Sequence, residues 1–327
     1  MATVFVTGAS GFVGRRLVRR LVADGHTVRG LARSDESAAT VAADGAEPVR
    51  GDLDDVEALE AGARDCKFVV HTAAALGASG DWSEFERINV GGTRRVAQAA
   101  RAGGARRLVH VSTEAVLMAG EPLEWVDETA PLRPDSRAPY AATKAMAEQV
   151  VVDENRDGLE AVILRPRFVW GAGDRTLLPQ LVEAVCDGGF AWIDGGRQLT
   201  TPTHVDNVVE GVVLSAERGA AGEAYFVTDD NPQIFRDFVT RLLRTQGIEP
   251  PEREAPSWLV GPVVRALEAA WKRLPLPGAP PLSSIEYWIF SQTQTLDIAK
   301  AKRELGYRPV TGLDEGMREL EAAAAIT

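Results

Sequence analysis

The sequence predicts an α/β fold, with a doubly wound parallel sheet and a smaller lobe that is mostly C-terminal. Five short apolar runs recur in the first half of the chain, and stretches with a helical spacing of apolar residues separate them. The runs are TVFVTG at 3–8, TVRGLA at 27–32, FVVHTA at 68–73, RLVHVST at 107–113 and AVILRP at 161–166. They are continuous rather than alternating, as in parallel strands that helices cover on both faces. This order of strands and helices predicts right-handed crossovers.

The regular alternation ends near residue 171. Beyond it, the segment 257–290 is richer in tryptophan and proline than the first half of the chain. We therefore expect residues 1–171 to form the first domain and residues 172–327 to contribute mainly to a second lobe. Residues 200–228 are expected to return to the first domain.

Composition excludes several classes of protein. The chain of 327 residues has a formal net charge of −11, whereas nucleic-acid binding needs clustered Lys and Arg. Cys66, Cys186 and the four histidines have neither the number nor the spacing of a disulfide scaffold or a metal site. No apolar run approaches the roughly 20 residues that span a bilayer, and the N-terminal residues lack a secretory pattern. We expect a cytoplasmic protein that binds no metal.

A glycine-rich stretch, TGASGFVG, joins the first predicted strand to the first helix. Its glycines, Gly8, Gly11 and Gly14, are three residues apart. This spacing permits a tight turn and close approach of the backbone to a pyrophosphate, whose charge the amide groups at a helix N-terminus favour. The stretch therefore predicts a dinucleotide cofactor.

The end of the second predicted strand indicates which dinucleotide binds. An acidic residue there would accept hydrogen bonds from the adenosine ribose and indicate NAD. The run VRGLARSDE instead places Ala32 at this point, so no carboxylate repels a 2′-phosphate. Arg33, the next residue, would pair with that phosphate, so NADP is favoured. Asp35 and Glu36 follow closely and keep NAD open. Asp52, in GDLDD, either flanks the adenine or caps the next helix.

Short motifs along almost the whole chain resemble the extended short-chain dehydrogenase/reductase family of the epimerase/dehydratase superfamily, most of all its 3β-hydroxysteroid dehydrogenase-like branch. The motifs are TGASGFVG, GDL, HTAA at 71–74, NVGGT at 89–93, HVST at 110–113, YAATK at 140–144, RPRFVWG at 165–171, HVDNV at 204–208 and AKRELGYRP at 301–309. The resemblance implies a Rossmann domain, a Ser/Thr–Tyr–Lys catalytic set and a substrate lobe. It also implies a homodimer formed through helices near 89–103 and 140–155.

Tyr140 and Lys144 lie four residues apart in APYAATKAMAEQV and therefore on one face of a helix. A tyrosine pKa near 10 is too high for efficient proton transfer at neutral pH, and a nearby ammonium charge would lower it. Tyr140 would then be the general acid or base, and Lys144 would also hold the nicotinamide ribose, as in the family. Thr113 or Ser112 would orient the reacting oxygen; counting back from Val116, which resembles a family valine, favours Thr113.

The resemblance also implies the surroundings of the cofactor. The expected contacts are Gly8, Ser10, Gly11, Phe12, Val13, Gly14, Arg33, Asp52, Leu53, Thr72, Ala73, Ala74, Tyr140, Lys144, Pro166, Phe168 and Val169. Asn89 resembles a family asparagine that ties a helix to a strand. His71 and His110 are expected in the core.

Two stretches of the second lobe bear on the substrate. Nucleotide-sugar enzymes of this family carry a Gln-x-Arg-Asp-Phe-x-His run whose arginine helps to grip the diphosphate; here QLTTPTH at 198–204 places Thr200 at the arginine position. A hydroxyl cannot make the charge-assisted bidentate contact that a diphosphate favours. The apolar segment 257–290 suits a hydrophobic pocket instead. The other expected walls of this pocket are Trp82, Thr113, Trp170 and Trp192.

We therefore expect an NAD(P)-dependent oxidoreductase that interconverts a secondary alcohol and a ketone. The expected substrate is bulky and hydrophobic: 3β-hydroxysteroid-like, sterol-like, or a long-chain β-hydroxy or β-keto acid. A nucleotide-sugar epimerase or dehydratase is the first alternative, in which Arg175 or Arg236 would replace the missing arginine. A non-catalytic NADP-binding sensor or scaffold is the second, although such proteins usually lack the Tyr–Lys pair that this chain retains.

Overall fold

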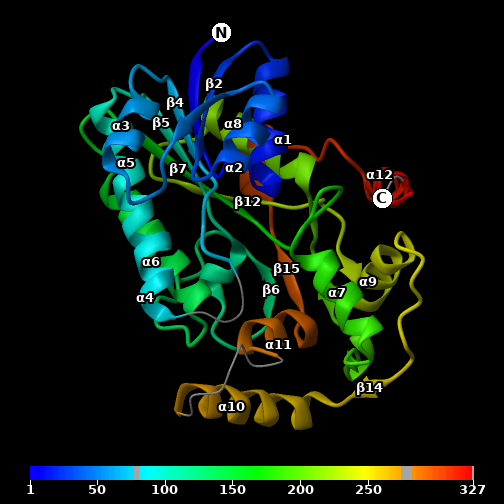
Figure 1. The fold of residues 1–327 in the computed structure, drawn as a ribbon. Coiled ribbons are helices and arrows are strands. Elements are labelled where there is room, and N and C mark those ends of the chain that lie inside the picture. Colours follow the sequence, from blue (N-terminus) through cyan, green and yellow to red (C-terminus); the bar gives the residue numbers. More distant parts are fainter. Residues whose placement is uncertain (77–80, 274–281, 326–327) are drawn as a thin grey trace.

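The fold comes from a computed structural model that describes residues 1–76, 81–273 and 282–325 (Figure 1). Its main element is a seven-stranded sheet in the order β12-β7-β5-β4-β1-β2-β3, and every neighbouring pair of strands is parallel. In chain order the strands are β1 (Thr3–Thr7), β2 (Thr27–Ala32), β3 (Glu47–Arg50), β4 (Phe68–His71), β5 (Arg107–Val111), β7 (Glu160–Pro166) and β12 (Ala224–Val227). The predicted fold class is confirmed.

The five apolar runs form β1, β2, β4, β5 and β7, as predicted. Strand β3 has no apolar run because it lies at the edge of the sheet, where none of its residues is fully buried. Strand β12 pairs with β7 and comes from the segment 200–228. The strand order reverses between β1 and β4, and such a switch point opens a ligand crevice at the carboxyl ends of the strands.

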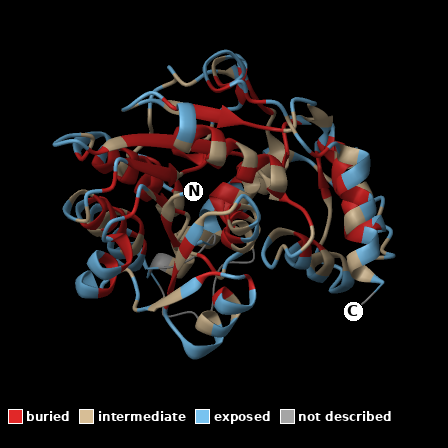
Figure 2. Ribbon diagram, turned by 90° about the horizontal axis from the view of Figure 1, so that it is seen from above, coloured by how far each residue is buried: buried red, intermediate tan, exposed pale blue. Residues whose placement is uncertain are grey.

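Helices cover both faces of this sheet (Figure 1). Helices α3 (Val56–Ala63), α5 (Thr93–Ala102) and α6 (Pro139–Asp153) pack together on one face, and a π-helical segment, η1 (Glu86–Gly92), leads into α5. Helices α1 (Phe12–Ala23), α2 (Asp35–Ala43) and α8 (Val205–Arg218) lie on the other. Figure 2 shows the buried residues concentrated along the strands and the inner faces of these helices. The apolar face of α1 is buried through Leu17, Val18 and Leu21.

The second lobe contains a four-stranded sheet in the order β13-β10-β15-β6. Its strands are β6 (Leu123–Val126), β10 (Leu199–Thr200), β13 (Gln233–Ile234) and β15 (Gln294–Leu296). Two further strand pairs are β8 (Val169–Trp170) with β11 (Thr203–His204) and β9 (Trp192–Ile193) with β14 (Glu254–Ala255). Because β6 precedes residue 171 in the chain, this sheet takes one strand from the first half.

The remaining helical segments are mostly C-terminal. They are α4 (Trp82–Phe85), η2 (Glu114–Leu117), α7 (Leu177–Cys186), η3 (Asp194–Gly196), α9 (Phe235–Arg244), α10 (Ser257–Arg273), α11 (Ser284–Ser291), η4 (Ala301–Leu305) and α12 (Leu313–Ala324). Part of the apolar segment expected to line a pocket, 274–281, lies outside the described residues. Across the described part of the chain, no helix has the length and apolarity needed to cross a membrane.

The tryptophans expected beside a pocket differ in their environments. Trp170 and Trp192 are each only 1% exposed and belong to the core of the second lobe. The ring of Trp170 meets that of Phe238 edge-on, with centroids 5.6 Å apart, and Trp192 meets Phe190 at 4.8 Å. Trp82 is 41% exposed. Two of the three tryptophans therefore fill a core, which is the usual place of large aromatic side chains.

A buried ion pair ties α6 to β7. Arg165 donates Nε and Nη2 hydrogen bonds to the Glu148 carboxylate at 2.6–3.1 Å, and both side chains are at most 5% exposed. Glu148→Ala would leave a buried guanidinium without its partner, so we expect the free energy of unfolding to fall by about 3–5 kcal/mol. Urea titration measures this loss.

An exposed pair provides the matched control for this prediction. Arg244 and Glu249 are 60% and 70% exposed, so Arg244→Ala should cost less than about 1 kcal/mol. A Glu148→Ala loss as small as that of the control would contradict the role given to the buried pair.

Candidate active site

The glycine loop joins β1 to α1 in a tight turn. Gly8 has φ +71°, and a Cβ there would lie 2.5 Å from the Thr72 hydroxyl oxygen. A Cβ on Gly14 would lie 2.0 Å from the Gly8 carbonyl oxygen, so only glycine allows α1 to begin this close to the strand. A Cβ on Gly11 would meet only the Gly8 carbonyl, and no side chain caps the helix there. The loop therefore leaves the first-turn amide groups open to an anion, as a dinucleotide pyrophosphate requires.

The structure brings most of the expected cofactor contacts to this edge of the sheet. Thr72 follows β4 and donates its hydroxyl to the Thr7 carbonyl at 2.8 Å, which ties the two loops together. Leu53 lies against Gly92 of η1. The ring of Phe168 packs on Phe235 and Phe238, so contact with a cofactor there would come from its backbone. The other expected contacts on these loops are Ser10, Phe12, Val13, Ala73 and Ala74 beside β1 and β4, with Pro166 and Val169 near the end of β7.

The region after β2 holds the residues expected to select the cofactor. Arg33 is exposed, directly follows β2 and has no hydrogen bond or ion pair with any described residue. The Asp35 carboxylate faces Arg50 at 3.2 Å, so its charge is partly balanced. Asp52 accepts a hydrogen bond from the Asp55 amide at 3.2 Å, and it is Asp55 that caps α3. Of these residues, Arg33 is the free cation beside the expected ribose position.

Helix α6 carries the tyrosine and the lysine. It begins at Pro139, a residue suited to the first helical position, and places Tyr140 in its first turn. The Lys144 Nζ donates to the Val111 carbonyl at 2.9 Å and lies 3.2 Å from the His110 Nε2. Burial lowers the pKa of Lys144 to about 8. The lysine is therefore held at the carboxyl end of β5.

The two candidate hydroxyls have different surroundings. Thr113 donates its hydroxyl to the Glu114 Oε2 at 2.8 Å and lies close enough to Tyr140 to lower its pKa. The hydroxyl of Ser112 is buried without a hydrogen-bond partner. Only Thr113 therefore lies beside the tyrosine hydroxyl. Burial, together with the Glu114 carboxylate, raises the pKa of Tyr140 above its usual value. Thr113 lowers this pKa but does not outweigh burial and Glu114, and Lys144 is not among the groups that shift it here.

Sequence reasoning missed two charged residues at this site. Glu114 is 5% exposed and Arg167 is 1% exposed, and their side chains approach to 3.6 Å. Each is a charged residue directly before an apolar stretch, AVL or FVW, which is the signal that could have identified them. Arg167 also donates to the Gln294 Oε1 at 2.8 and 3.1 Å and to the Thr200 hydroxyl. These contacts connect the sheet edge to strands β10 and β15 of the second lobe.

Buried polar side chains connect the strands and helices around the site. The Asn89 side chain accepts from the Ala75 amide at 2.8 Å and donates to the Thr143 hydroxyl at 3.1 Å, so it ties η1 to α6. His71 lies between the hydroxyls of Thr7 and Thr93, at 2.6 and 3.0 Å. These contacts are consistent with the structural role expected for both residues.

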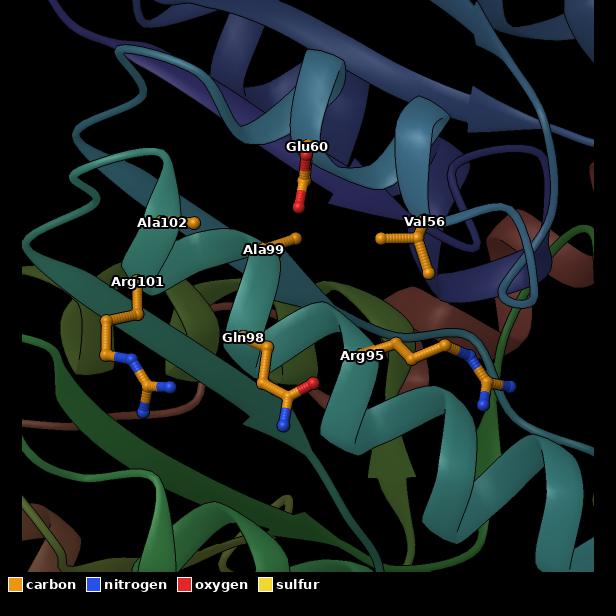
Figure 3. Close-up of a pocket in the computed structure, with 7 residues that line it drawn as sticks. All are labelled: Val56, Glu60, Arg95, Gln98, Ala99, Arg101 and Ala102. Carbon is orange, nitrogen blue, oxygen red and sulfur yellow. The ribbon is translucent and has the colours of Figure 1, made fainter.

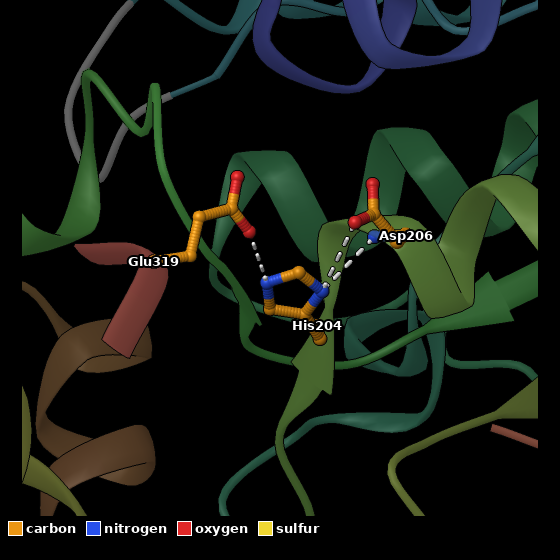
Figure 4. A group of neighbouring side chains, drawn as sticks. All are labelled: His204, Asp206 and Glu319. Carbon is orange, nitrogen blue, oxygen red and sulfur yellow. Dashed lines mark hydrogen bonds and ion pairs between the residues drawn. The ribbon is translucent and has the colours of Figure 1, made fainter. Parts of the chain in front are cut away.

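A second polar cluster lies where α1, α8 and α12 meet (Figure 4). His204, Asp206 and Glu319 place possible ligand atoms within 4.8 Å of one another. The Arg16 guanidinium contacts both carboxylates, so a cation of the protein already balances their charge. The cluster therefore fastens the C-terminal helix to the main sheet.

A surface hollow of about 300 Å³ lies between α3 and α5 (Figure 3). Its two arginines already have protein partners. Arg95 donates to the Leu53 carbonyl at 2.6 Å, and Arg101 pairs with Glu154. Neither Tyr140 nor Lys144 is among the residues that line this hollow.

Comparisons with known proteins agree with this geometry. The sequence profile of the 3-beta hydroxysteroid dehydrogenase/isomerase family matches residues 5–256. The 4-hydroxy-2-methyl-3-oxo-4-farnesyl-3,4-dihydroquinoline-1-oxide ketoreductase of Stigmatella aurantiaca is 44% identical over 98% of this chain and 96% of its own. The 2-alkyl-3-oxoalkanoate reductase of Stenotrophomonas maltophilia is 36% identical over 98% of this chain and 99% of its own. The crystal structure of DesIV, a dTDP-glucose 4,6-dehydratase from Streptomyces venezuelae with NAD bound, is 26% identical, covers 99% of this chain and 97% of its own, and has a TM-score of 0.77.

Lys144 predicts how stability depends on pH. The unfolded chain keeps the lysine proton up to a pKa of 10.5, whereas the folded chain releases it near 8. Between these values the unfolded state binds more protons, so the free energy of unfolding should rise with pH there. Lys144→Met should remove up to about 3 kcal/mol of this rise in urea titrations at several pH values.

The control for this measurement is Lys302, which is 45% exposed and paired with Asp230. Lys302→Met should keep the rise seen in the wild type. A rise that survives in Lys144→Met would show that another group causes it.

Proposed function

The chain belongs to the 3-beta hydroxysteroid dehydrogenase/isomerase family, and we propose that it uses NADPH to reduce the ketone of a bulky hydrophobic 3-oxo compound. Like its relatives, it is an NAD(P)-dependent oxidoreductase acting on CH–OH groups. The observation that supports the proposal most is the position of the Thr113 hydroxyl beside Tyr140, with Lys144 one turn further along α6. These residues lie at the same edge of the sheet as the glycine loop.

Tyr140, Thr113 and Lys144 have different roles in the proposed reduction. The cofactor, when bound, supplies a hydride to the carbonyl carbon. Tyr140 gives its hydroxyl proton to the carbonyl oxygen as the C=O π bond breaks, which yields a secondary alcohol and balances the two electrons of the hydride with one proton. The raised pKa of Tyr140 keeps the phenol protonated at neutral pH but makes it a weaker acid. Proton transfer therefore depends on the basicity that the carbonyl oxygen gains as the hydride arrives. Thr113 orients the reacting oxygen, and Lys144 would hold the nicotinamide ribose.

We infer the substrate class from the names of the relatives and from the contacts of two arginines, Arg167 and Arg236. The names of both relatives reported above specify a 3-oxo group and an alkyl or farnesyl chain. Arg167 is buried and committed to Thr200, Gln294 and Glu114, so it offers no charge to a diphosphate. Arg236 pairs with two glutamates. Both features favour a ketone on a hydrophobic chain over a nucleotide sugar.

We also propose a homodimer through the helices near 89–103 and 140–155. On α6, Gln149, Val152 and Asp153 are exposed, and Val152 is an apolar residue that is 50% exposed. In the same way we propose that residues 1–171, joined by 200–228, bind the cofactor, while the lobe beyond residue 171 binds the substrate.

Tyr140→Phe tests the assigned mechanism. Loss of the proton donor should lower kcat by about 10²- to 10⁴-fold, measured as NADPH oxidation with a 2-alkyl-3-oxoalkanoate, while NADPH still binds. Tyr225→Phe is the matched control, because its hydroxyl bonds to Glu304 and the Ala220 amide on the far edge of the sheet. Unchanged activity in Tyr140→Phe would refute the mechanism. Turnover of UDP-glucose in place of the ketone would refute the substrate class.

Arg33→Ala tests the choice of NADP over NAD. Removing a charge-assisted contact with the 2′-phosphate should weaken NADPH binding by about 10- to 100-fold and leave NADH binding nearly unchanged. Quenching or enhancement of cofactor fluorescence measures both dissociation constants. Arg197→Ala, at a side chain that is 81% exposed, is the control. If the wild type binds NADH more tightly than NADPH, Arg33 does not select the cofactor.

A further inference from the structure

Glu114 is a buried carboxylate directly beside the proposed catalytic pair. It is the first residue of η2, the short helix that follows β5, and is only 5% exposed. Its Oε2 accepts the hydroxyl proton of Thr113 at 2.8 Å, and the Thr113 hydroxyl in turn lies beside Tyr140, whose pKa it lowers. Three groups that hold or exchange protons therefore form a continuous chain from the interior to the reacting oxygen.

The charge of Glu114 is only weakly balanced. Arg167 donates its N–H groups to Gln294 and Thr200. Its Nε lies 3.6 Å from the Glu114 Oε1, which is too far for a hydrogen bond. In the neighbouring Glu148–Arg165 pair, by contrast, three hydrogen bonds of 2.6–3.1 Å hold the carboxylate. A buried carboxylate that a cation neutralises as weakly as Arg167 does Glu114 can gain and lose a proton.

The direction of the Thr113 hydrogen bonds depends on the state of Glu114. A hydroxyl has one proton to donate. While Glu114 is ionised it takes that proton, so Thr113 can only accept from Tyr140 and from the Ala115 amide. Once Glu114 is protonated, its own O–H donates to Thr113 and frees the threonine proton to point at the tyrosine or the substrate oxygen.

We propose that Glu114 is a positioning residue of the reduction that passes a proton to Tyr140 through the Thr113 hydroxyl. The inference rests on the proposed function, because Tyr140 becomes a phenolate only when it has protonated the substrate oxygen. Thr113 then gives its proton to the phenolate and receives one from Glu114, which is left as a carboxylate near Arg167. No electron changes hands, and the carboxylate regains its proton from solvent between turnovers.

The surroundings of Glu114 support this role. The ionisable side chains facing it are Arg167, which follows β7, and Tyr140 on α6. Burial raises the pKa of Glu114, and Arg167 and Thr113 only partly oppose this effect. A proton therefore binds to Glu114 closer to neutral pH than it would to an exposed glutamate.

Glu114→Gln tests the inference, because glutamine has the same size but no proton to pass on. We expect the rate of a single turnover, with enzyme in excess over ketone, to stay within about threefold of wild type, while kcat falls at least about tenfold. The wild-type kcat should decrease as pH rises through the pKa of Glu114, and the variant should lack this decrease. A purely structural carboxylate would leave kcat and its pH profile unchanged in the variant, and that result would overturn the proposal. So would an equal fall of the single-turnover rate and kcat.

Glu128→Gln is the matched control. Glu128 is a second glutamate whose pKa burial raises, but it bonds the Phe226 amide at 2.7 Å, away from Thr113. Its substitution should leave kcat and the pH profile unchanged.

Infrared spectroscopy separates this inference from the proposed function. The wild type without substrate should show a buried protonated carboxyl that titrates above the range of free glutamate and disappears in Glu114→Gln but not in Glu128→Gln. If no such band exists, the inference fails even when the ketone is reduced. If the band exists and no ketone is reduced, the proposed function fails while the ionisation of Glu114 stands.

Discussion

The docking of α6 onto the sheet is the constraint on which the site depends. Ala141, Ala142 and Ala145 are fully buried, and their small side chains let the helix backbone approach β7 and η2 closely. The next turns are fixed by polar contacts, from Lys144 to a β5 carbonyl and from Glu148 to β7. Burying these charges costs free energy of solvation, so their main effect is to define where the helix sits rather than how stable it is. These contacts fix the first turn of α6, so that Tyr140 lies beside Thr113.

The same helix is coupled to the cofactor loop through neutral polar groups. His71 joins β1 to α5, Asn89 joins η1 to α6, and the ring of His110 lies 5.2 Å from that of His71 and next to Lys144. Burial and the lysine charge lower the pKa of His71 to about 3, so the imidazoles stay neutral. The layer therefore contains the positive charge of Lys144 alone, and that charge remains available to groups at the sheet edge.

Local sequence patterns predicted the parts of the fold that burial determines. Continuous apolar runs marked the strands covered on both faces, and the spacing of Tyr140 and Lys144 placed them on one helical face. The patterns could not reveal β3, because an edge strand needs no apolar run. They also did not separate the core tryptophans Trp170 and Trp192 from residues lining a pocket, because both positions favour the same side chains. Glu114 and Arg167 were missed because their pairing joins segments 53 residues apart, and only the fold shows that they meet.

The threonine at position 200 and the buried Arg167 depend on each other physically. Thr200 stands where nucleotide-sugar enzymes of the resembling family carry an arginine, and here its hydroxyl accepts a hydrogen bond from Arg167. A guanidinium at position 200 would bring a second positive charge against Arg167 in a buried site, where like charges repel strongly. The neutral threonine therefore permits the buried arginine, which lies 3.6 Å from Glu114. In this chain position 200 holds a buried arginine of the protein through a hydroxyl, where a second guanidinium would be repelled.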